Sequence, residues 1–358
     1  MAKTLSLSAA VLRHREFRPT PVGASGLLRH FQPHPPTSLT ALCIQMGPFV
    51  VERDAFRFIN NFPITDEQAA QIRQHYRIFA DVVVGAGVRL VRDVLASLSV
   101  SVPIIGVVGL PAVVIDAVVG EVTTQLAGSL IDKIADPIPG TFGRCGGMTC
   151  AGFDFYLLDW TVDERLGTTP PVTGPLSDYL FGRLLDNIDL NAETFLDWIV
   201  NLHLMPIISS AANITLGTAV GALGGPIGAA FGALLGSQVN VFHLGGPKVT
   251  LDRTKSEFQR ITSTLDREAA CPIALIYSDS AVPTDQHVVL AVSYVDNHDG
   301  TANLFMWDSN SANTLQVLAL DMRGDELQVG VSNSARPVKG IFLEKYAFQK
   351  PPDSLRLP

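Results

Sequence analysis

The spacing of hydrophobic positions changes along the chain, from a helical period in the first part to a strand-like period in the last third. Thr65–Gln68 has the pattern of a capping box, in which threonine and glutamine side chains cap a helix start reciprocally. Hydrophobic residues then recur at helical steps, which predicts a helix from Thr65 to about Val84 with one face toward a core. These residues are Ala69, Ile72, Tyr76, Phe79 and Val83.

The last third of the chain predicts one helix followed by short strands. Leu251–Arg267 is polar with a helical period. Runs rich in β-branched and aromatic residues, separated by turns of Asp, Ser, Gly and Asn, predict the strands Pro272–Tyr277, His287–Val295, Asn303–Trp307 and Lys339–Phe348. Helices first and strands later favour an α+β fold over a doubly wound parallel sheet.

Two long apolar stretches interrupt this pattern. Residues 94–115 carry no charged side chain and, as a helix, would be about 33 Å long, enough to cross a bilayer core. Pro103 and Pro111 break the stretch, which favours a buried, interrupted helical pair. The second stretch, 198–247, is also free of Asp, Glu, Lys and Arg.

Glycines within the second stretch repeat every four residues. The two sets are Gly217, Gly221 and Gly225, and Gly224, Gly228, Gly232 and Gly236. Such a glycine-zipper-like spacing places each set on one helix face, where another backbone can approach closely. Residues 206–240 therefore predict either a packed helical hairpin or a membrane-inserting segment.

Composition narrows the functional class. The 358 residues are 47% hydrophobic and only 17% charged, with a net charge of −8, which gives no reason to expect a nucleic-acid partner. Residues 1–48 differ, because they carry five Lys or Arg residues against Glu16 alone and six prolines. We expect a flexible basic arm over 1–48, an apolar helical part over 49–140 and a core over 141–352 with an insertion at about 206–240.

The arm has no clear secretory signal, so we expect a cytoplasmic protein or one exported by a non-Sec route. A targeting role for the arm is the alternative. Membrane association, through 94–115 and 206–240, and a homo-oligomer are further expectations from the apolar stretches.

Cys145 is the first candidate for chemistry. The chain has four cysteines, too few for a disulfide scaffold, which favours reduced thiols. Glycines precede Cys145 and an apolar helical pattern follows, so Cys145 is predicted at a helix N-terminus, where the helix dipole and the neighbouring Arg144 would favour a thiolate. Cys150 lies within the same helix and is predicted to be core. A zinc site of Cys145, Cys150, Cys271 and His287 lacks the usual ligand spacing, and we expect no metal or cofactor.

His287 is the candidate base. It begins a predicted strand, and the next strand returns to end at Asp308-Ser-Asn310, so a hairpin would bring Asp308 or Asn310 to the His287 ring. The carboxylate would fix the imidazole tautomer and stabilise the imidazolium. His298 lies in the intervening turn and is predicted to be solvated.

The order Cys145, His287, Asp308 resembles that of papain-like cysteine hydrolases, including the C39-type peptidases. Blocks in order resemble a group of microbial proteins with that fold; they are Gly143–Met148, Pro175–Leu180, His287–Leu290, Asp308–Asn310, Gly340–Phe342, Tyr346 and Pro351-Pro352. The resemblance covers about residues 142–352 and implies a papain-like core. Papain-like enzymes carry a glutamine shortly before the cysteine, and this chain has none between Asp136 and Arg144.

These observations predict a cysteine-nucleophile, peptidase-like hydrolase that acts on a peptide or protein substrate. Cys145 would attack, His287 would act as base and acid, and Asp308 would orient His287, with Asn310 as the substitute. The alternative is a membrane-inserting or pore-forming protein, such as a toxin or effector, on an inactive papain-like scaffold. A third reading is an inactive scaffold for protein binding.

Overall fold

The computed structural model describes residues 48–75, 141–162, 164–199, 201–202, 247–279, 285–311 and 313–357. The predictions for the basic arm, for residues 94–115 and for the glycine-rich segment 206–240 concern residues outside these ranges. Within the described ranges, no helix has both the length and the apolar character needed to span a membrane.

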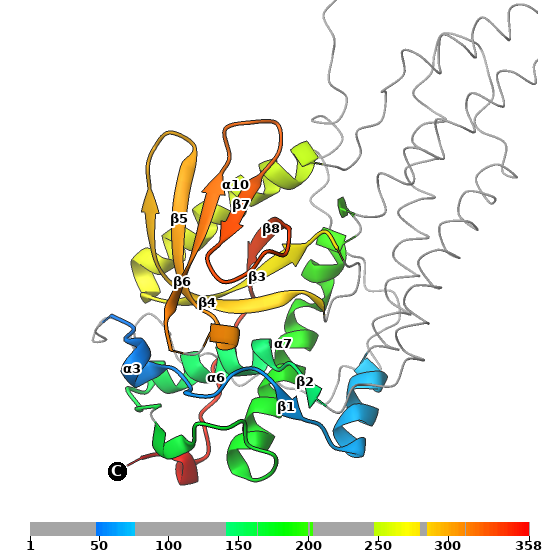
Figure 1. Cartoon of the computed structure of the whole chain (residues 1–358), viewed down its shortest axis with the longest axis vertical. Coiled ribbons are helices and arrows are strands. Elements are labelled where there is room, and N and C mark those ends of the chain that lie inside the picture. Colours follow the sequence, from blue (N-terminus) through cyan, green and yellow to red (C-terminus); the bar gives the residue numbers. More distant parts are fainter. Residues whose placement is uncertain are drawn as a thin grey trace, which may run out of the picture.

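A six-stranded antiparallel sheet forms the centre of the described structure, with strand order β7-β6-β5-β4-β3-β8 (Figure 1). Its strands are β3 (Cys271–Tyr277), β4 (His287–Asp296), β5 (Thr301–Trp307), β6 (Leu315–Asp321), β7 (Gln328–Val331) and β8 (Val338–Leu343). A short pair, β1 (Phe62–Pro63) with β2 (Thr141–Phe142), lies apart from it.

Helices cover both faces of the sheet. In Figure 1, α10 (Pro247–Glu268) lies behind the strands, whereas α6 (Cys145–Leu157) and α7 (Pro175–Ile199) lie below them. Along β3, Ile273 and Leu275 pack with α10. The intervening Ala274 and Ile276 pack with Trp198 of α7. Because successive side chains of a strand point to opposite faces, a strand covered on both sides is buried throughout, as β3 is.

The sequence predicts the mixed α+β class and most of these elements. The helix α10 and the strands β3, β4 and β5 occur where they are expected, to within a few residues. The capping box is also present, because Thr65 Oγ1 accepts the Gln68 N–H and Gln68 Oε1 accepts the Thr65 N–H. The strands β6 and β7 are additional to the prediction, and β8 ends at Leu343 and not at Phe348.

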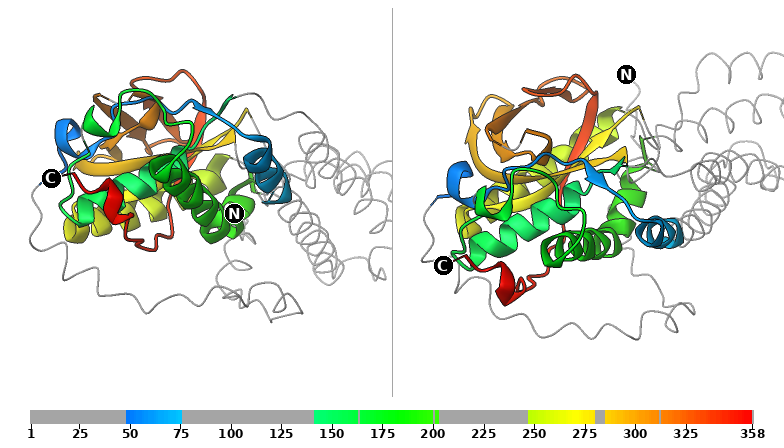
Figure 2. Two further views of the ribbon diagram at one scale, coloured as in Figure 1. Left: turned by 90° about the horizontal axis from the view of Figure 1, so that it is seen from below. Right: turned by 60° about the horizontal axis from the view of Figure 1, so that its bottom comes forward.

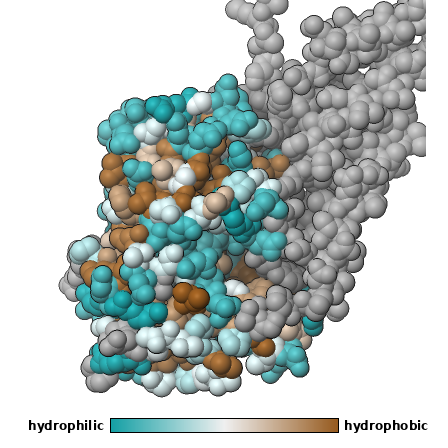
Figure 3. Space-filling view, viewed as in Figure 1, coloured by the Kyte–Doolittle hydropathy of each residue, from teal (hydrophilic) through white to brown (hydrophobic). Residues whose placement is uncertain are grey.

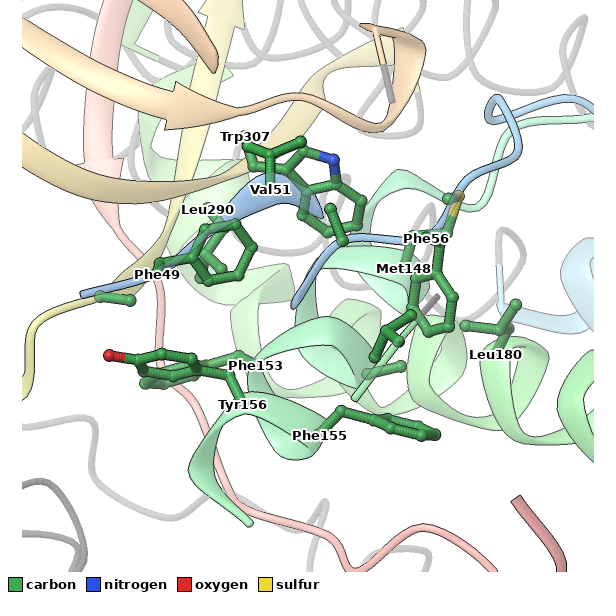
Figure 4. Packing of buried hydrophobic residues seen from close by; sticks show 14 of the residues in the cluster. Phe49, Val51, Phe56, Met148, Phe153, Phe155, Tyr156, Leu180, Leu290 and Trp307 are labelled. Atoms are coloured by element: carbon green, nitrogen blue, oxygen red, sulfur yellow. The ribbon is translucent and has the colours of Figure 1, made fainter. Parts of the chain in front are cut away.

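Residues before β1 belong to the same core as α6. Phe49, Val51 and Phe56 pack against Trp307 of β5 and Tyr156 of α6 (Figure 4). The predicted boundary at residues 140–141 therefore does not separate these residues from the core that contains the sheet.

Glycines bring α6 and α7 unusually close together. A Cβ atom on Gly147 would collide with the main-chain oxygen of Leu180, and one on Gly146 would collide with the Asn187 side chain. Only glycine can occupy such positions without moving the neighbouring helix. The Gly-Gly pair after Cys145 thus fixes the depth at which α6 lies against α7.

A buried ionic cluster joins α6, α7 and the segment that follows β8. The Asp154 carboxylate, which is fully buried, accepts from Arg183 Nε at 2.7 Å and from the hydroxyls of Tyr179 and Tyr346 at 2.7 and 2.5 Å. It also accepts the Gln349 N–H at 3.0 Å. Figure 2 shows the C-terminal segment (red) crossing these helices on the side away from the sheet.

The described surface mixes both kinds of residue. Figure 3 shows hydrophobic residues (brown) interspersed with hydrophilic ones (teal) over the face that it presents. The large exposed hydrophobic side chains come from separate elements, for example Ile59, Val172 and Val295. Scattered apolar residues of this kind are normal for protein surfaces.

Candidate active site

Cys145 is the first residue of α6 and is partly exposed. Its sulfur lies close to the His287 ring and to backbone groups of Val288 and Gly146, each of which lowers the pKa of the thiol. The hydroxyl of Thr149, one turn along α6, donates to the Val288 carbonyl at 3.2 Å and ties the helix to β4 beside the site. The structure thus has Cys145 at the predicted helix start and in contact with the predicted base.

The β4–β5 hairpin brings Asp308 to His287. Leu290 of β4 pairs with Trp307, the last residue of β5, so the chain leaves β5 beside the start of β4. His287 Nε2 lies 2.7 Å from Asp308 Oδ1, and both side chains are buried. Because Nε2 faces the carboxylate, Nδ1 is the ring nitrogen left for the Cys145 sulfur.

The electrostatics of the three groups favour a thiolate–imidazolium pair. Burial opposes ionisation of Cys145, but the hydrogen bond and charge of His287 and the two backbone hydrogen bonds hold its pKa below the ordinary value. Burial would lower the pKa of His287, yet hydrogen bonds to Asp308 and Cys145, with their charges, raise it to about 10. The pKa of Asp308 is depressed despite burial, chiefly by the hydrogen bond and charge of His287.

Two asparagines complete the surroundings of Asp308. The backbone N–H of Asn310 donates to Asp308 Oδ1 at 2.8 Å, and Asn333 Nδ2 donates to Asp308 Oδ2 at 2.7 Å. The Asn310 amide lies 3.3 Å from His287 Nε2. Since the proton on Nε2 is directed to the closer carboxylate, Asp308 and not Asn310 is the principal partner of the ring. Asn333 follows β7 in an irregular segment, and no local pattern in the sequence identifies it.

Arg144 does not have the role predicted from its position beside Cys145. Its guanidinium is buried and donates to the Ser177 carbonyl at 3.0 Å and to Gln68 Oε1 at 3.1 Å. It lies over the rings of Phe62 and Phe181, and it is not among the main causes of the depressed pKa of Cys145. Arg144 instead joins the capped helix of residues 66–75 to the start of α7, because the rings and carbonyls that fit a buried guanidinium lie on that side.

The other two described cysteines lack the partial exposure and the depressed pKa of Cys145. Cys150 and Cys271 are buried, and burial raises the pKa of each thiol far above its ordinary value. Cys150 lies in the core as predicted.

Within the described ranges, no three His, Cys, Asp or Glu side chains converge as metal ligands. His298 occupies a turn with its side chain exposed, as predicted, and its φ is positive at 58°.

A cleft of about 490 Å³ opens over Cys145, His287 and Asp308. Its walls also include Asn60 from the segment before β1 and Arg336 before β8. A second recess of about 50 Å³ also borders Cys145 and lies between α7 and the start of β4. Cys145 therefore borders both the cleft and the smaller recess.

The sequence predicts that Cys145, His287 and Asp308 come together, because a helix start and a hairpin bring them to one place. It does not predict the positions of Asn60 and Asn333. The proximity of Asn60 and Asn333 depends on long-range packing of irregular segments.

No protein-family model, curated protein or solved structure matches this chain, so the assignment of a function depends on the geometry of the site itself.

Proposed function

We propose that the protein is a cysteine-nucleophile hydrolase that acts by acyl transfer. The observation that carries the proposal is the chain of contacts from Cys145 through His287 to Asp308 at the floor of an open cleft. A thiol with a depressed pKa, a base in contact with it and a carboxylate that orients the base are the three parts that such chemistry requires. Neither Cys150 nor Cys271 has this combination.

The arrangement of elements supports the papain-like resemblance. A helix that begins with the nucleophile packs against an antiparallel sheet, and that sheet carries the histidine at the start of one strand and the aspartate after the next. In papain-like enzymes these groups have the same chain order. We propose a papain-like core on this basis.

Acylation begins with the thiolate. The Cys145 sulfur attacks the carbonyl carbon of the substrate, the carbonyl π electrons move to oxygen, and a tetrahedral intermediate forms. When the carbonyl re-forms, the bond from carbon to the leaving nitrogen, oxygen or sulfur breaks, and the His287 imidazolium gives its proton to the leaving group. The product at this point is a thioester on Cys145, and His287 is neutral.

Deacylation restores the resting state. Neutral His287 removes a proton from water as the water oxygen attacks the thioester carbonyl. The sulfur then leaves as thiolate, the product is a carboxylic acid, and His287 is again imidazolium. Asp308 accepts the Nε2–H throughout, which keeps Nδ1 directed at the sulfur and the reacting carbon.

The substrate class is a peptide, isopeptide or thioester carbonyl. The cleft is lined by polar side chains, including Asn333 and Arg336, and the recess between α7 and β4 is mostly apolar. We propose that a polypeptide segment lies in the cleft with the scissile carbonyl over Cys145.

Selective alkylation tests the proposal. Iodoacetamide at pH 6–7, followed by peptide mapping, is expected to label Cys145 well before Cys150 and Cys271, which serve as internal controls in the same molecule. Replacing Cys145 by Ala should abolish both the labelling and any hydrolysis of a peptide-ester library. Equal labelling rates for the three thiols, or labelling of Cys145 only after denaturation, would overturn the proposal.

A further inference from the structure

The chain before β1 reaches the mouth of the cleft and is fixed there on both sides. Phe62 and Pro63 pair with Phe142 and Thr141, so the segment runs beside the residues that lead into α6. The backbone N–H of Asn60 donates to the Ser309 carbonyl at 3.0 Å, next to Asp308. Asn60 is thus held between the two elements that carry the nucleophile and the orienting carboxylate.

The Asn60 side-chain amide has a defined orientation. Its Oδ1 accepts the backbone N–H of Arg144, the residue directly before Cys145. Because an N–H group can only donate, the amide oxygen and not the amide nitrogen must face it. The Nδ2 group is therefore turned elsewhere, toward the Cα of Gly143, and a Cβ atom on Gly143 would lie only 3.2 Å from it.

The Asn60 Nδ2 group can donate a hydrogen bond to a substrate. Among the described residues, no group accepts a hydrogen bond from Asn60 Nδ2, and Asn60 lines the cleft together with Gly143 and Cys145. Such a donor, rigidly held beside the nucleophile, is what a carbonyl oxygen needs as it becomes negatively charged. The residues directly before Cys145 contain no glutamine that could supply it.

We infer that Asn60 is the side-chain oxyanion donor of this site, an inference that rests on the proposed function. During acylation, Nδ2 donates a hydrogen bond to the substrate oxygen while the oxygen carries the negative charge, and no proton is transferred. The Arg144 N–H holds the amide oxygen, so the donor needs no reorganisation when the charge develops. A segment more than 80 residues upstream of Cys145 in the sequence thereby completes the site.

The test compares two reactions of Cys145 that differ only in whether an oxyanion forms. Acylation by p-nitrophenyl acetate passes through a tetrahedral oxyanion, whereas alkylation by iodoacetamide does not. Both rates are measured at pH 8, where His287, with a pKa raised to about 10, is protonated and the lowered pKa of Cys145 favours its thiolate. The variants are Asn60→Ala and Asn60→Asp, with Asn61→Ala as the matched control at an exposed neighbouring position.

We expect Asn60→Ala and Asn60→Asp to lower the acylation rate about 10²- to 10³-fold, since this is the usual effect of removing one oxyanion donor. Alkylation should stay within about threefold, and Asn61→Ala should change neither rate. The aspartate keeps an acceptor for the Arg144 N–H, so it separates loss of the donor from disturbance of the helix start.

Three outcomes would overturn the inference. Unchanged acylation in both variants would show that Asn60 does not donate to the oxyanion. Parallel losses in acylation and alkylation would show a structural role. If the unmodified protein reacts with neither reagent at Cys145, the proposed function fails, and the role of Asn60 fails with it.

Discussion

The two ends of α6 each bury an ionisable side chain within a hydrogen-bonded cluster, but only one cluster is open. At the start of the helix, Cys145 faces a cleft and contacts His287. Toward its other end, Asp154 is fully enclosed and is paired with Arg183 at 2.7 Å. We call the first the open cluster, consisting of Cys145, His287 and Asp308, and the second the closed cluster, consisting of Asp154, Arg183, Tyr179 and Tyr346.

The clusters differ in the hydrogen-bonding capacity that they leave unused. Both oxygens of Asp154 accept strong donors, which leaves no place for a substrate or a water molecule. In the open cluster, Cys145 is partly exposed and borders the cleft of about 490 Å³. Burial and charge pairing are therefore common to both clusters, and access distinguishes the group that can react from the group that stabilises the fold.

The largest expected effect is that of replacing His287 by Ala on the reactivity of Cys145. Without the imidazolium, burial returns the pKa of the thiol to its ordinary 9.0 or above, so the thiolate fraction at pH 6 falls. Alkylation at pH 6 should fall in the same proportion, and turnover by about 10⁴-fold or more, because His287 also transfers the protons. Rates are followed by mass spectrometry of the Cys145 peptide.

The pH profile supplies the control for this prediction. In the unmodified protein, alkylation should already be fast below the usual thiol range and stay fast as the pH rises. Turnover should instead fall as His287 loses its proton near pH 10, since the neutral ring cannot protonate the leaving group. The His287→Ala variant should approach the wild-type alkylation rate above pH 9. Equal rates at pH 6 would contradict the ion pair.

In the closed cluster, Asp154→Ala should lower stability and leave reactivity intact. Removal of the carboxylate leaves the buried Arg183 guanidinium without its closest charge partner and with only Asp186, at 3.3 Å, which costs about 3–5 kcal/mol in the free energy of unfolding. Urea unfolding gives this value, and the alkylation rate of Cys145, measured in the absence of denaturant, should stay within about threefold. A loss of reactivity larger than the loss of folded protein would mean that the closed cluster also serves the site.

The sequence predicts the open cluster better than the closed one, for physical reasons. Cys145 begins a helix and His287 begins a strand, and local patterns mark both positions. Asp154 lies inside an apolar helix, and its partner Tyr346 is 192 residues away in an irregular segment. The predicted effect of Arg144 on the Cys145 thiolate came from sequence adjacency, whereas packing against Phe62 and Phe181 decides where its guanidinium lies.

The fold shows the same division between local and long-range information. The helix α10 and the strand β3 have unambiguous periods in the sequence. In β6, by contrast, Gln316 is buried while Leu315 is exposed, so the usual alternation of apolar and polar residues is inverted at the start of the strand. The contribution of residues 49–62 to the core depends on contacts with α6 and β5 that no local period encodes.

The next effect separates the two candidate orienting residues within the open cluster. Asp308→Ala removes the closest partner of His287 and a main cause of its raised pKa, so alkylation at pH 6 should fall about 10-fold and turnover about 10²- to 10³-fold. Asn310→Ala keeps the backbone N–H that donates to Asp308, so its effect should stay below about fivefold. If Asn310→Ala were the more severe variant, the assignment of the orienting residue would be reversed.

The smallest effects come from removing one hydrogen-bond donor from the carboxylate of each cluster. Tyr346→Phe removes one donor from Asp154 and should cost about 1.5–3 kcal/mol in unfolding free energy, with no change in alkylation, because the lost bond is made to a fully buried charged group. Asn333→Ala removes one donor from Asp308 but lies at the exposed rim, where water can replace the lost group. Its unfolding free energy should change by less than about 0.5 kcal/mol, as for most surface substitutions. Turnover should fall only a few-fold, because Asp308 would hold the imidazolium less firmly. Urea unfolding and reactivity are measured on both variants. A larger loss of stability in Asn333→Ala than in Tyr346→Phe would contradict the distinction between the clusters.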